Sequence, residues 1–282
     1  MSRQQFLATG EMDPFFTSWA YQDLAQIAYE QNELAKAQHS LSQALALRAK
    51  PEEGVHVFSS GALIHARLLH ACGETQKAQE MLMRWERSTH FSWPLSTIQV
   101  LLARLHLALG NLPAVEQWAQ YAFSPQTSTQ ERSLPLLYQQ EEALLLARLH
   151  IAQKRGEIAL QVLTPWKEKA QAQGRGRSVL EIQILEALAH AAYQEQSQAQ
   201  TPLLQAVKLA QPENYQRLFL DEGPMMESLL KTILPELRNP SLLSFVRTLL
   251  RAFARERDVL SPKEETPSRV SMALRLHIRN SS

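Results

Sequence analysis

Hydrophobic residues along this chain recur at three- and four-residue intervals, the spacing of one face of an α-helix. The periodic segments are interrupted at residues 32–33, at Gly73, at Gly110, at residues 154–156 and at residues 194–195. Glycine and asparagine tolerate the left-handed backbone conformation that ends a helix, so such breaks indicate tight turns. The pattern therefore predicts five helical hairpins and an all-α fold.

The second helix of each predicted hairpin carries one small residue at an equivalent position. These residues are Ala37, Ala78, Val115, Ala159 and Ala199. A small side chain there lets neighbouring helices approach closely, and a single hairpin cannot bury its apolar face alone. We expect the hairpins to stack in a row and bury this position between neighbours.

The first hairpin resembles a tetratricopeptide repeat. Its first helix carries an apolar stripe of Trp19, Leu24, Ile27 and Ala28, and residues 29–37 follow the repeat motif closely. The small-residue positions are 41, 37, 44 and 40 residues apart, whereas strict tetratricopeptide arrays repeat about every 34 residues. The prediction is an α-α superhelix of loose tetratricopeptide-like hairpins.

The segment after the last hairpin is more specific. Residues 217–226 read Arg-Leu-Phe-Leu-Asp-Glu-Gly-Pro-Met-Met. This stretch resembles the end of the sensor region in large ATP-dependent LuxR-type transcriptional regulators, the MalT-like family that includes the bacterial maltose-regulon activator. The resemblance extends over roughly residues 19–265. It implies a superhelical sensor, a pair of linker helices and then a helix-turn-helix that reads DNA.

The resemblance implies three regions. Residues 1–220 would form the superhelical sensor domain, and residues 221–260 would form the terminal linker helices. Residues 261–282 would be a disordered remnant of the start of a DNA-binding domain, because they are too short and too poorly patterned for a helix-turn-helix. No Walker A loop is present in the sequence. We therefore expect a sensor-domain fragment, either a natural truncation or an engineered one.

Composition narrows the function classes. Twenty-nine basic and 28 acidic side chains give a net charge of +1, so no global field favours nucleic acid or an anionic membrane. Cys72 is the only cysteine, which excludes an intrachain disulfide and suits a reducing compartment. No apolar run is long enough to span a membrane, and the N-terminus lacks the pattern of a signal peptide. The predicted location is the cytoplasm.

Three arginines are the candidate ligand-binding residues. Arg67, Arg104 and Arg148 occupy one equivalent position of successive first helices, which line the concave face of such superhelices. A guanidinium offers a planar fork of donors to carboxylates, phosphates or sugar hydroxyls. The alternative is that each arginine pairs locally with a glutamate or with carbonyl groups of the preceding repeat, and we favour this structural interpretation.

Other repeated residues have structural interpretations. His106, His150 and His190 share a position, but neighbouring hairpins are separated by about 8–10 Å, too far for one metal ion. We therefore expect inter-repeat histidines with hydrogen-bond partners and no metal site. Trp85, Trp118 and Trp166 are expected to pack between helices. Arg247, Arg251 and Arg255 form one face of a late helix, which is either solvated or a docking face for another domain.

No motif of a hydrolase or metalloenzyme is found, so we expect neither catalytic residues nor a cofactor. The leading hypothesis is a sensor that binds an inducer, such as an oligosaccharide or another small metabolite, or a regulatory protein. We expect no direct binding to nucleic acid or membranes, and self-association stays open. The alternative is a free-standing tetratricopeptide-like adaptor for a peptide or protein, although such an adaptor has no reason to carry residues 217–226.

Overall fold

The computed structural model describes residues 14–47, 55–88, 92–124, 134–193 and 195–260. Every regular element in these ranges is a helix. The predicted remnant of a DNA-binding domain at residues 261–282 lies outside the described residues. The all-α prediction is confirmed.

All five predicted hairpins are present. Their first helices are α2 (Pro14–Glu30), α4 (Val55–Ala71), α6 (Ser92–Ala108), α8 (Leu136–Ala152) and α10 (Gly176–Ala192). Their second helices are α3 (Leu34–Ala46), α5 (Thr75–Ser88), α7 (Leu112–Ala122), α9 (Gly156–Ala172) and α11 (Gln196–Ala210). The turn residues Asn32, Gly73, Gly110 and Lys154 have positive φ angles of 61°, 83°, 74° and 59°. These left-handed residues end the first helices where the sequence breaks predicted.

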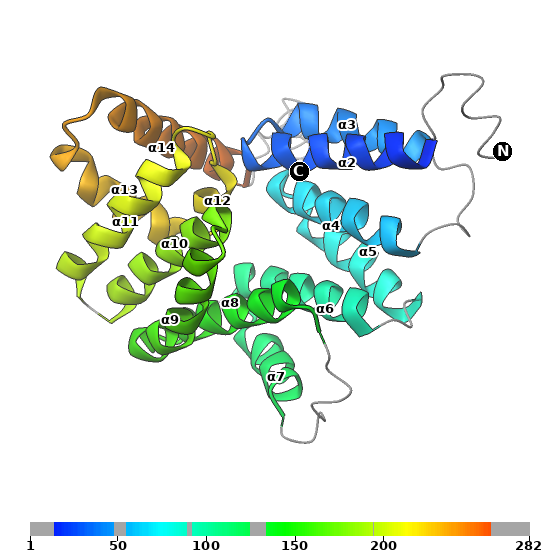
Figure 1. The fold of residues 1–282 in the computed structure, drawn as a ribbon, viewed down its shortest axis with the longest axis horizontal. Helices are drawn as coiled ribbons and strands as arrows, with labels where there is room; N and C mark the ends of the chain where they lie inside the picture. The colour runs from blue at the N-terminus through cyan, green and yellow to red at the C-terminus, as the bar shows by residue number, and fades with distance from the viewer. Residues whose placement is uncertain (1–13, 48–54, 89–91, 125–133, 194, 261–282) are drawn as a thin grey trace, which may run out of the picture.

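The hairpins follow an arc, with the first helices on its inner side and the second helices outside (Figure 1). After the last hairpin come α12 (Arg217–Leu220), α13 (Pro224–Ile233), a 3₁₀ turn (Leu234–Glu236) and α14 (Pro240–Leu260). Short helix α12 lies near the end of α2, so the chain after the last hairpin meets the first one (Figure 1). The backbone N–H of Gln216 donates to the carbonyl of Glu30 at 2.8 Å and joins these two regions directly.

The predicted small-residue position is the packing seam of the superhelix. All five of its residues are at most 1% exposed: Ala37, Ala78, Val115, Ala159 and Ala199. The largest hydrophobic cluster extends from α8 through α14 without interruption. The predicted linker helices α13 and α14 therefore share a core with the last two hairpins.

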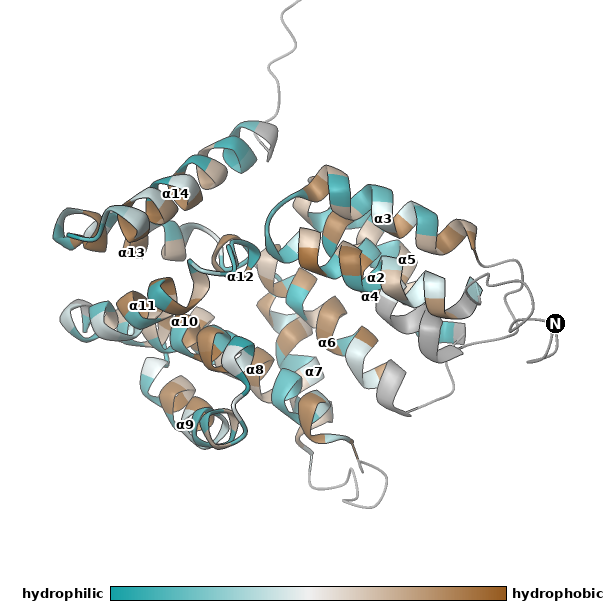
Figure 2. Cartoon of the chain, turned by 45° about the horizontal axis from the view of Figure 1, so that its top comes forward, coloured by the Kyte–Doolittle hydropathy of each residue, from teal (hydrophilic) through white to brown (hydrophobic). Residues whose placement is uncertain are grey.

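Helix α14 is amphipathic, with hydrophobic and hydrophilic residues interspersed along it (Figure 2). Val246 and Leu249 are fully buried against the core. Arg247, Arg251 and Arg255 are exposed on the other side. The tryptophan prediction is confirmed for Trp85, Trp118 and Trp166, each of which packs against a hydrophobic cluster.

Of the four residues in the apolar stripe predicted for the first helix, only Ala28 lies on the face that α2 buries. Trp19, Leu24 and Ile27 are 46%, 52% and 54% exposed. The buried face instead runs through Ala25 and Tyr29, because α3, α4 and α12 pack against that side. Periodicity identified the helix correctly but did not identify which of its two apolar faces is covered.

Gly156, the first residue of α9, marks a close approach between α9 and α10. A Cβ atom there would lie 2.1 Å from the carbonyl oxygen of Ala189. We expect Gly156→Ala to lower the free energy of unfolding by about 1–3 kcal/mol, because backbone must move. Gly176, the first residue of α10, has no atom near its added Cβ and is the matched control. Gly176→Ala should leave stability unchanged or raise it by about 0.4–1 kcal/mol.

Urea unfolding followed by circular dichroism measures both variants. Equal stabilities for Gly156→Ala and Gly176→Ala would contradict the close packing of α9 on α10.

Candidate functional site

Helix α10 places a carboxylate inside an apolar environment. Leu180, Ile182 and their neighbours are buried on nearly every side of this helix, and Glu181 is buried among them with its side chain only 3% exposed. A buried carboxylate is costly unless cations or hydrogen-bond donors compensate it. Two arginines do so: Nη2 of Arg148 lies 2.8 Å from Glu181, and Nη1 of Arg177 lies 3.2 Å from it.

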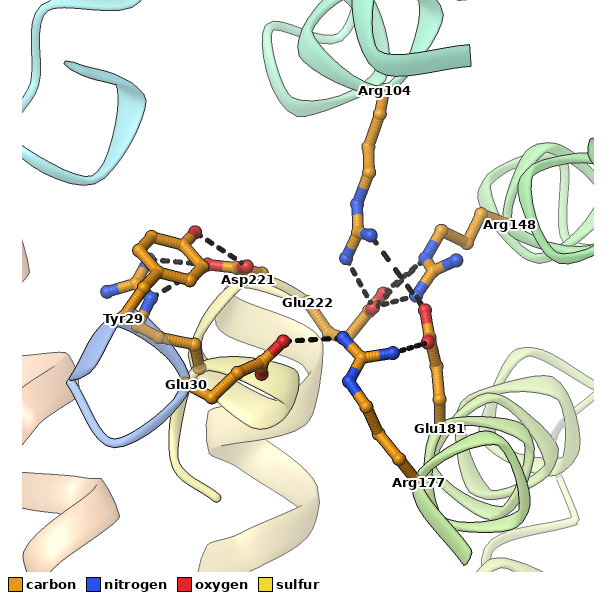
Figure 3. A network of polar contacts seen from close by, with 9 residues as sticks. Tyr29, Glu30, Arg104, Arg148, Arg177, Glu181, Asp221 and Glu222 are labelled. Carbon is orange, nitrogen blue, oxygen red and sulfur yellow. Dashed lines mark hydrogen bonds and ion pairs between the residues drawn. The ribbon is translucent and has the colours of Figure 1, made fainter. Parts of the chain in front are cut away.

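A second carboxylate reaches the same arginine from the C-terminal part of the chain. Glu222, in the turn after α12, accepts hydrogen bonds from Nε and Nη2 of Arg148 at 2.9 and 2.6 Å. It also accepts from Nη2 of Arg104 at 3.1 Å. Arg104, Arg148 and Arg177 come from three successive first helices and point toward Glu181 and Glu222 (Figure 3).

The same cluster extends to the first hairpin. Nη2 of Arg177 lies 2.5 Å from Oε1 of Glu30, the last residue of α2. Gln26, one turn earlier on α2, donates to the same oxygen at 2.8 Å. A side-chain path therefore connects α10 to the end of α2, beside the backbone hydrogen bond between Gln216 and Glu30.

Asp221 anchors the other side of the turn. It accepts a hydrogen bond from the Tyr29 hydroxyl at 2.9 Å and from Nε of Arg217 at 3.0 Å. Arg217, whose side chain is 2% exposed, also donates to Asn32 at 3.2 Å and to Glu256 of α14. Adjacent residues Asp221 and Glu222 thus bind different elements: Asp221 binds residues of α2 and α12, whereas Glu222 binds residues of α6 and α8.

We call these nine charged residues the central charge network. They are the arginines 104, 148, 177 and 217 and the carboxylates of Glu30, Glu181, Asp221, Glu222 and Glu256. They come from α2, α6, α8, α10, α12 with its following turn, and α14. The network holds one carboxylate more than it holds arginines.

The charges shift one another's pKa values. Burial alone would raise the pKa of Glu181, but Arg148 and Arg177 hold it well below its ordinary value of 4.5. Burial also opposes ionisation of Asp221, yet Arg217 keeps its pKa below 3.8. Burial raises the pKa of Glu256, and the charge of Arg217 only partly offsets this. Among Glu181, Asp221 and Glu256, it is therefore Glu256 that the arginines compensate least.

Buried ion pairs contribute little net stability, because desolvation offsets most of the Coulomb attraction. Removing one partner is different, since it leaves an uncompensated buried charge at a cost of about 3–5 kcal/mol. Arg148 and Glu222 are 5% and 7% exposed, so this applies to them directly. The intact network therefore adds little to the free energy of unfolding. Its main effect is that arrangements of the arc in which one partner is missing are unfavourable.

The structure separates the three arginines predicted to bind ligand. Arg104 and Arg148 lie in the central charge network and converge on Glu222, which is 118 and 74 residues away. The structural alternative predicted that each arginine pairs with a nearby glutamate. Arg104 and Arg148 do pair with a glutamate, but Glu222 is far from both in the sequence. Arg67 of α4 is half-buried and, within the described part of the chain, makes no hydrogen bond or ion pair.

The three histidines at the next repeated position differ in their contacts. Nδ1 of His106 lies 3.5 Å from Gln79 of the preceding hairpin and 3.3 Å from Asn111. His190 lies 3.3 Å from Glu195 of its own turn. Nδ1 of His150 is buried and has no hydrogen-bond partner among the described residues. The expected inter-repeat contact is therefore present at His106, and no described group of three potential ligands could hold a metal.

An open hollow of about 300 Å³ lies between α7 and α8. Its polar lining residues are Glu116, Gln120, His150, Gln153 and Arg155. No residue of the central charge network lines this hollow. It is a separate, solvent-open feature at the turn end of the fourth hairpin.

Sequence reasoning missed the acidic half of the network and Arg177. One usable signal was the position of Glu181 within an apolar run, since a lone charge there requires a buried partner. Asp221 and Glu222 lie in the segment singled out by resemblance, but their partners are set by tertiary structure. Their roles follow only from the way the arc closes.

Comparison with known proteins gives one family. The model of the MalT-like TPR region matches residues 4–236, which include all five hairpins, α12 and α13. No curated protein matches the chain. In the described ranges, no helix has the length and apolar character needed to cross a membrane.

The lowered pKa values of Glu181 and Asp221 predict acid sensitivity. These carboxylates bind protons less readily in the folded state, so their contribution to stability is complete above about pH 4.5. It is lost as the pH falls below their ordinary values of 4.5 and 3.8. The raised pKa of Glu256 acts in the opposite direction and offsets part of this loss.

Urea unfolding at a series of pH values tests this prediction with Asp221→Asn as the comparison. The variant should be less stable at pH 7 and lose less stability between about pH 5 and pH 3, because one of the two groups is gone. Parallel pH profiles for the wild type and Asp221→Asn would show that Asp221 is not the group responsible.

Proposed function

The chain belongs to the family of MalT-like TPR regions, and on this basis we propose that it is the signal-sensing region of a LuxR-type ATP-dependent transcriptional regulator. In this role it works in the cytoplasm and acts by binding rather than by catalysis. Its ligand is an inducer, such as an oligosaccharide or another small metabolite, or a regulatory protein. The ligand binds on the inner, concave side of the arc.

The observation that carries this proposal is the row of arginines on successive first helices. Arg67, Arg104 and Arg148 occupy equivalent positions on α4, α6 and α8, which lie on the inner side of the arc (Figure 1). Each guanidinium can present a planar fork to a polar or anionic ligand. Arg67 is the most available of the three, since Arg104 and Arg148 already bind carboxylates of the chain itself.

The C-terminal segment supports a sensor rather than a passive scaffold. Asp221 and Glu222 reach into the inner side of the arc, while α13 and α14 continue from them and pack on the last hairpin. A ligand that prefers one arrangement of this turn would therefore also shift the position of the helices that follow. Such a differential affinity is what couples a binding site to a distant output.

A thermal-shift screen against oligosaccharides and small metabolites tests the proposal. A ligand should raise the melting temperature of the wild-type chain in a saturable manner, because it binds only the folded state. Arg67→Met should weaken this rise without changing the unliganded melting temperature, because Arg67 lies in the same row as Arg104 and Arg148. Arg84→Met, at an exposed position on outer helix α5, is the matched control and should retain the full rise.

Two results would count against the proposal. A screen in which no compound raises the melting temperature would contradict sensing of a small molecule. A ligand whose effect is equal in the wild type, Arg67→Met and Arg84→Met would contradict a site on the inner side of the arc.

A further inference from the structure

Glu222 binds the Arg148 guanidinium as a carboxylate from solution would. Nε and Nη2 of Arg148 both face its carboxylate, with Nε 2.9 and 3.2 Å from the two oxygens. Arg104 adds a third N–H donor from the neighbouring hairpin. Oε1 of Glu222 accepts from Nε and Nη2 of Arg148 and from Nη2 of Arg104. Charge-assisted hydrogen bonds of this kind favour an ionised carboxylate as the acceptor.

We infer that Arg104 and Arg148 form a carboxylate-binding site, that Glu222 fills it as an intramolecular ligand, and that a small organic acid enters by displacing Glu222. The inference rests on the proposed sensing function and specifies its ligand class and its regulation. The competitor is a compound that carries a carboxylate. Glu222 is the carboxylate that it replaces, while Asp221 stays bound to Arg217.

The remaining contacts of Arg148 show why the site needs a carboxylate. Glu181 binds Nη2 of Arg148 but not Nε, whose acceptors are both oxygens of Glu222. When Glu222 leaves, Nε of Arg148 and Nη2 of Arg104 lose their acceptor. An anion from solution restores these hydrogen bonds, and neutralises charge that would otherwise stay buried.

The local backbone allows Glu222 to leave without unfolding a long helix. Glu222 lies in the turn between α12, which has four residues, and α13. Gly223 follows with a φ of 74°, and no atom lies near the position of an added Cβ there. Rotation of the Glu222 side chain and of the backbone at Gly223 can therefore withdraw the Glu222 carboxylate from the arginines while Asp221 stays bound.

Displacement also explains how the site would be regulated. A tethered carboxylate has a high effective concentration. It therefore lowers the apparent affinity for a competing ligand, because the ligand binds only the fraction of molecules in which the site is open. Withdrawal of Glu222 moves the turn that leads into α13. If the organic acid changes the affinity of α13 for another domain by some factor, then binding of that domain changes the affinity for the acid by the same factor.

Chemical rescue of Glu222→Ala by acetate tests the site itself. This variant removes the internal carboxylate and leaves room for another one. Its melting temperature should rise saturably with acetate at constant ionic strength, with chloride as the matched salt. Acetate affinity should be at least tenfold higher in Glu222→Ala than in the wild type, where Glu222 competes.

Two controls make the rescue specific. Glu222→Gln fills the same space without charge and should show no saturable rescue. Glu227→Ala removes a glutamate that pairs with Lys231 and Arg257, but these cations are 57% and 59% exposed and stay hydrated without it. It should also show no rescue. Equal acetate effects in all three variants would overturn the inference.

If Glu222→Ala does not fold, hydrogen exchange in the wild-type chain provides a second measurement with citrate as the probe. Citrate should accelerate exchange of amides in residues 217–226 relative to matched chloride, while α9 stays unchanged. Unchanged exchange in residues 217–226 at saturating citrate would overturn the displacement.

The two proposals fail in different ways. A ligand from the thermal-shift screen that binds the wild type and Glu222→Ala with equal affinity would leave sensing intact and overturn displacement of Glu222. Saturable acetate rescue of Glu222→Ala supports the carboxylate site even if that screen yields no ligand.

Discussion

The contact between Arg148 and the two carboxylates of Glu181 and Glu222 is the constraint on which the closed arrangement of this molecule depends. Arg148 is nearly inaccessible to solvent, so its charge must be compensated wherever the chain places it. Glu181 comes from the next first helix and compensates part of that charge. Glu222 completes the compensation from the C-terminal segment, which fixes where this segment must lie relative to the fourth hairpin.

Helical-repeat proteins are stabilised mainly by contacts between neighbouring repeats, and nothing in that scheme brings the first repeat to the last. Here the missing long-range contacts come from the central charge network, together with the Tyr29 hydroxyl and the backbone hydrogen bond between Gln216 and Glu30. Glu30 and Tyr29 at the end of α2 bind Arg177 and Asp221, from α10 and from the turn after α12. The apolar seams set the stacking of hairpins, and the polar network sets how the row closes.

The sequence was sufficient to predict what depends on neighbours in the chain. The five hairpins followed from helical periodicity, from turn residues such as Asn32 and Gly110, and from the small residues that α-helices need at close contacts. The partners of Arg104 and Arg148 were not predictable, because Glu222 reaches them only through the curvature of the whole arc. For the same reason the sequence did not reveal which apolar face of α2 is covered, since α12 contributes to covering it.

The central claim is that Arg148 and Glu222 are energetically coupled, and a double-mutant cycle measures this most directly. The free energies of unfolding of the wild type, Arg148→Met, Glu222→Gln and the double variant would be compared by urea titration. The account predicts that the second substitution costs much less once the first is present, with a coupling energy of about 1–3 kcal/mol. Additive losses, with a coupling energy near zero, would contradict it.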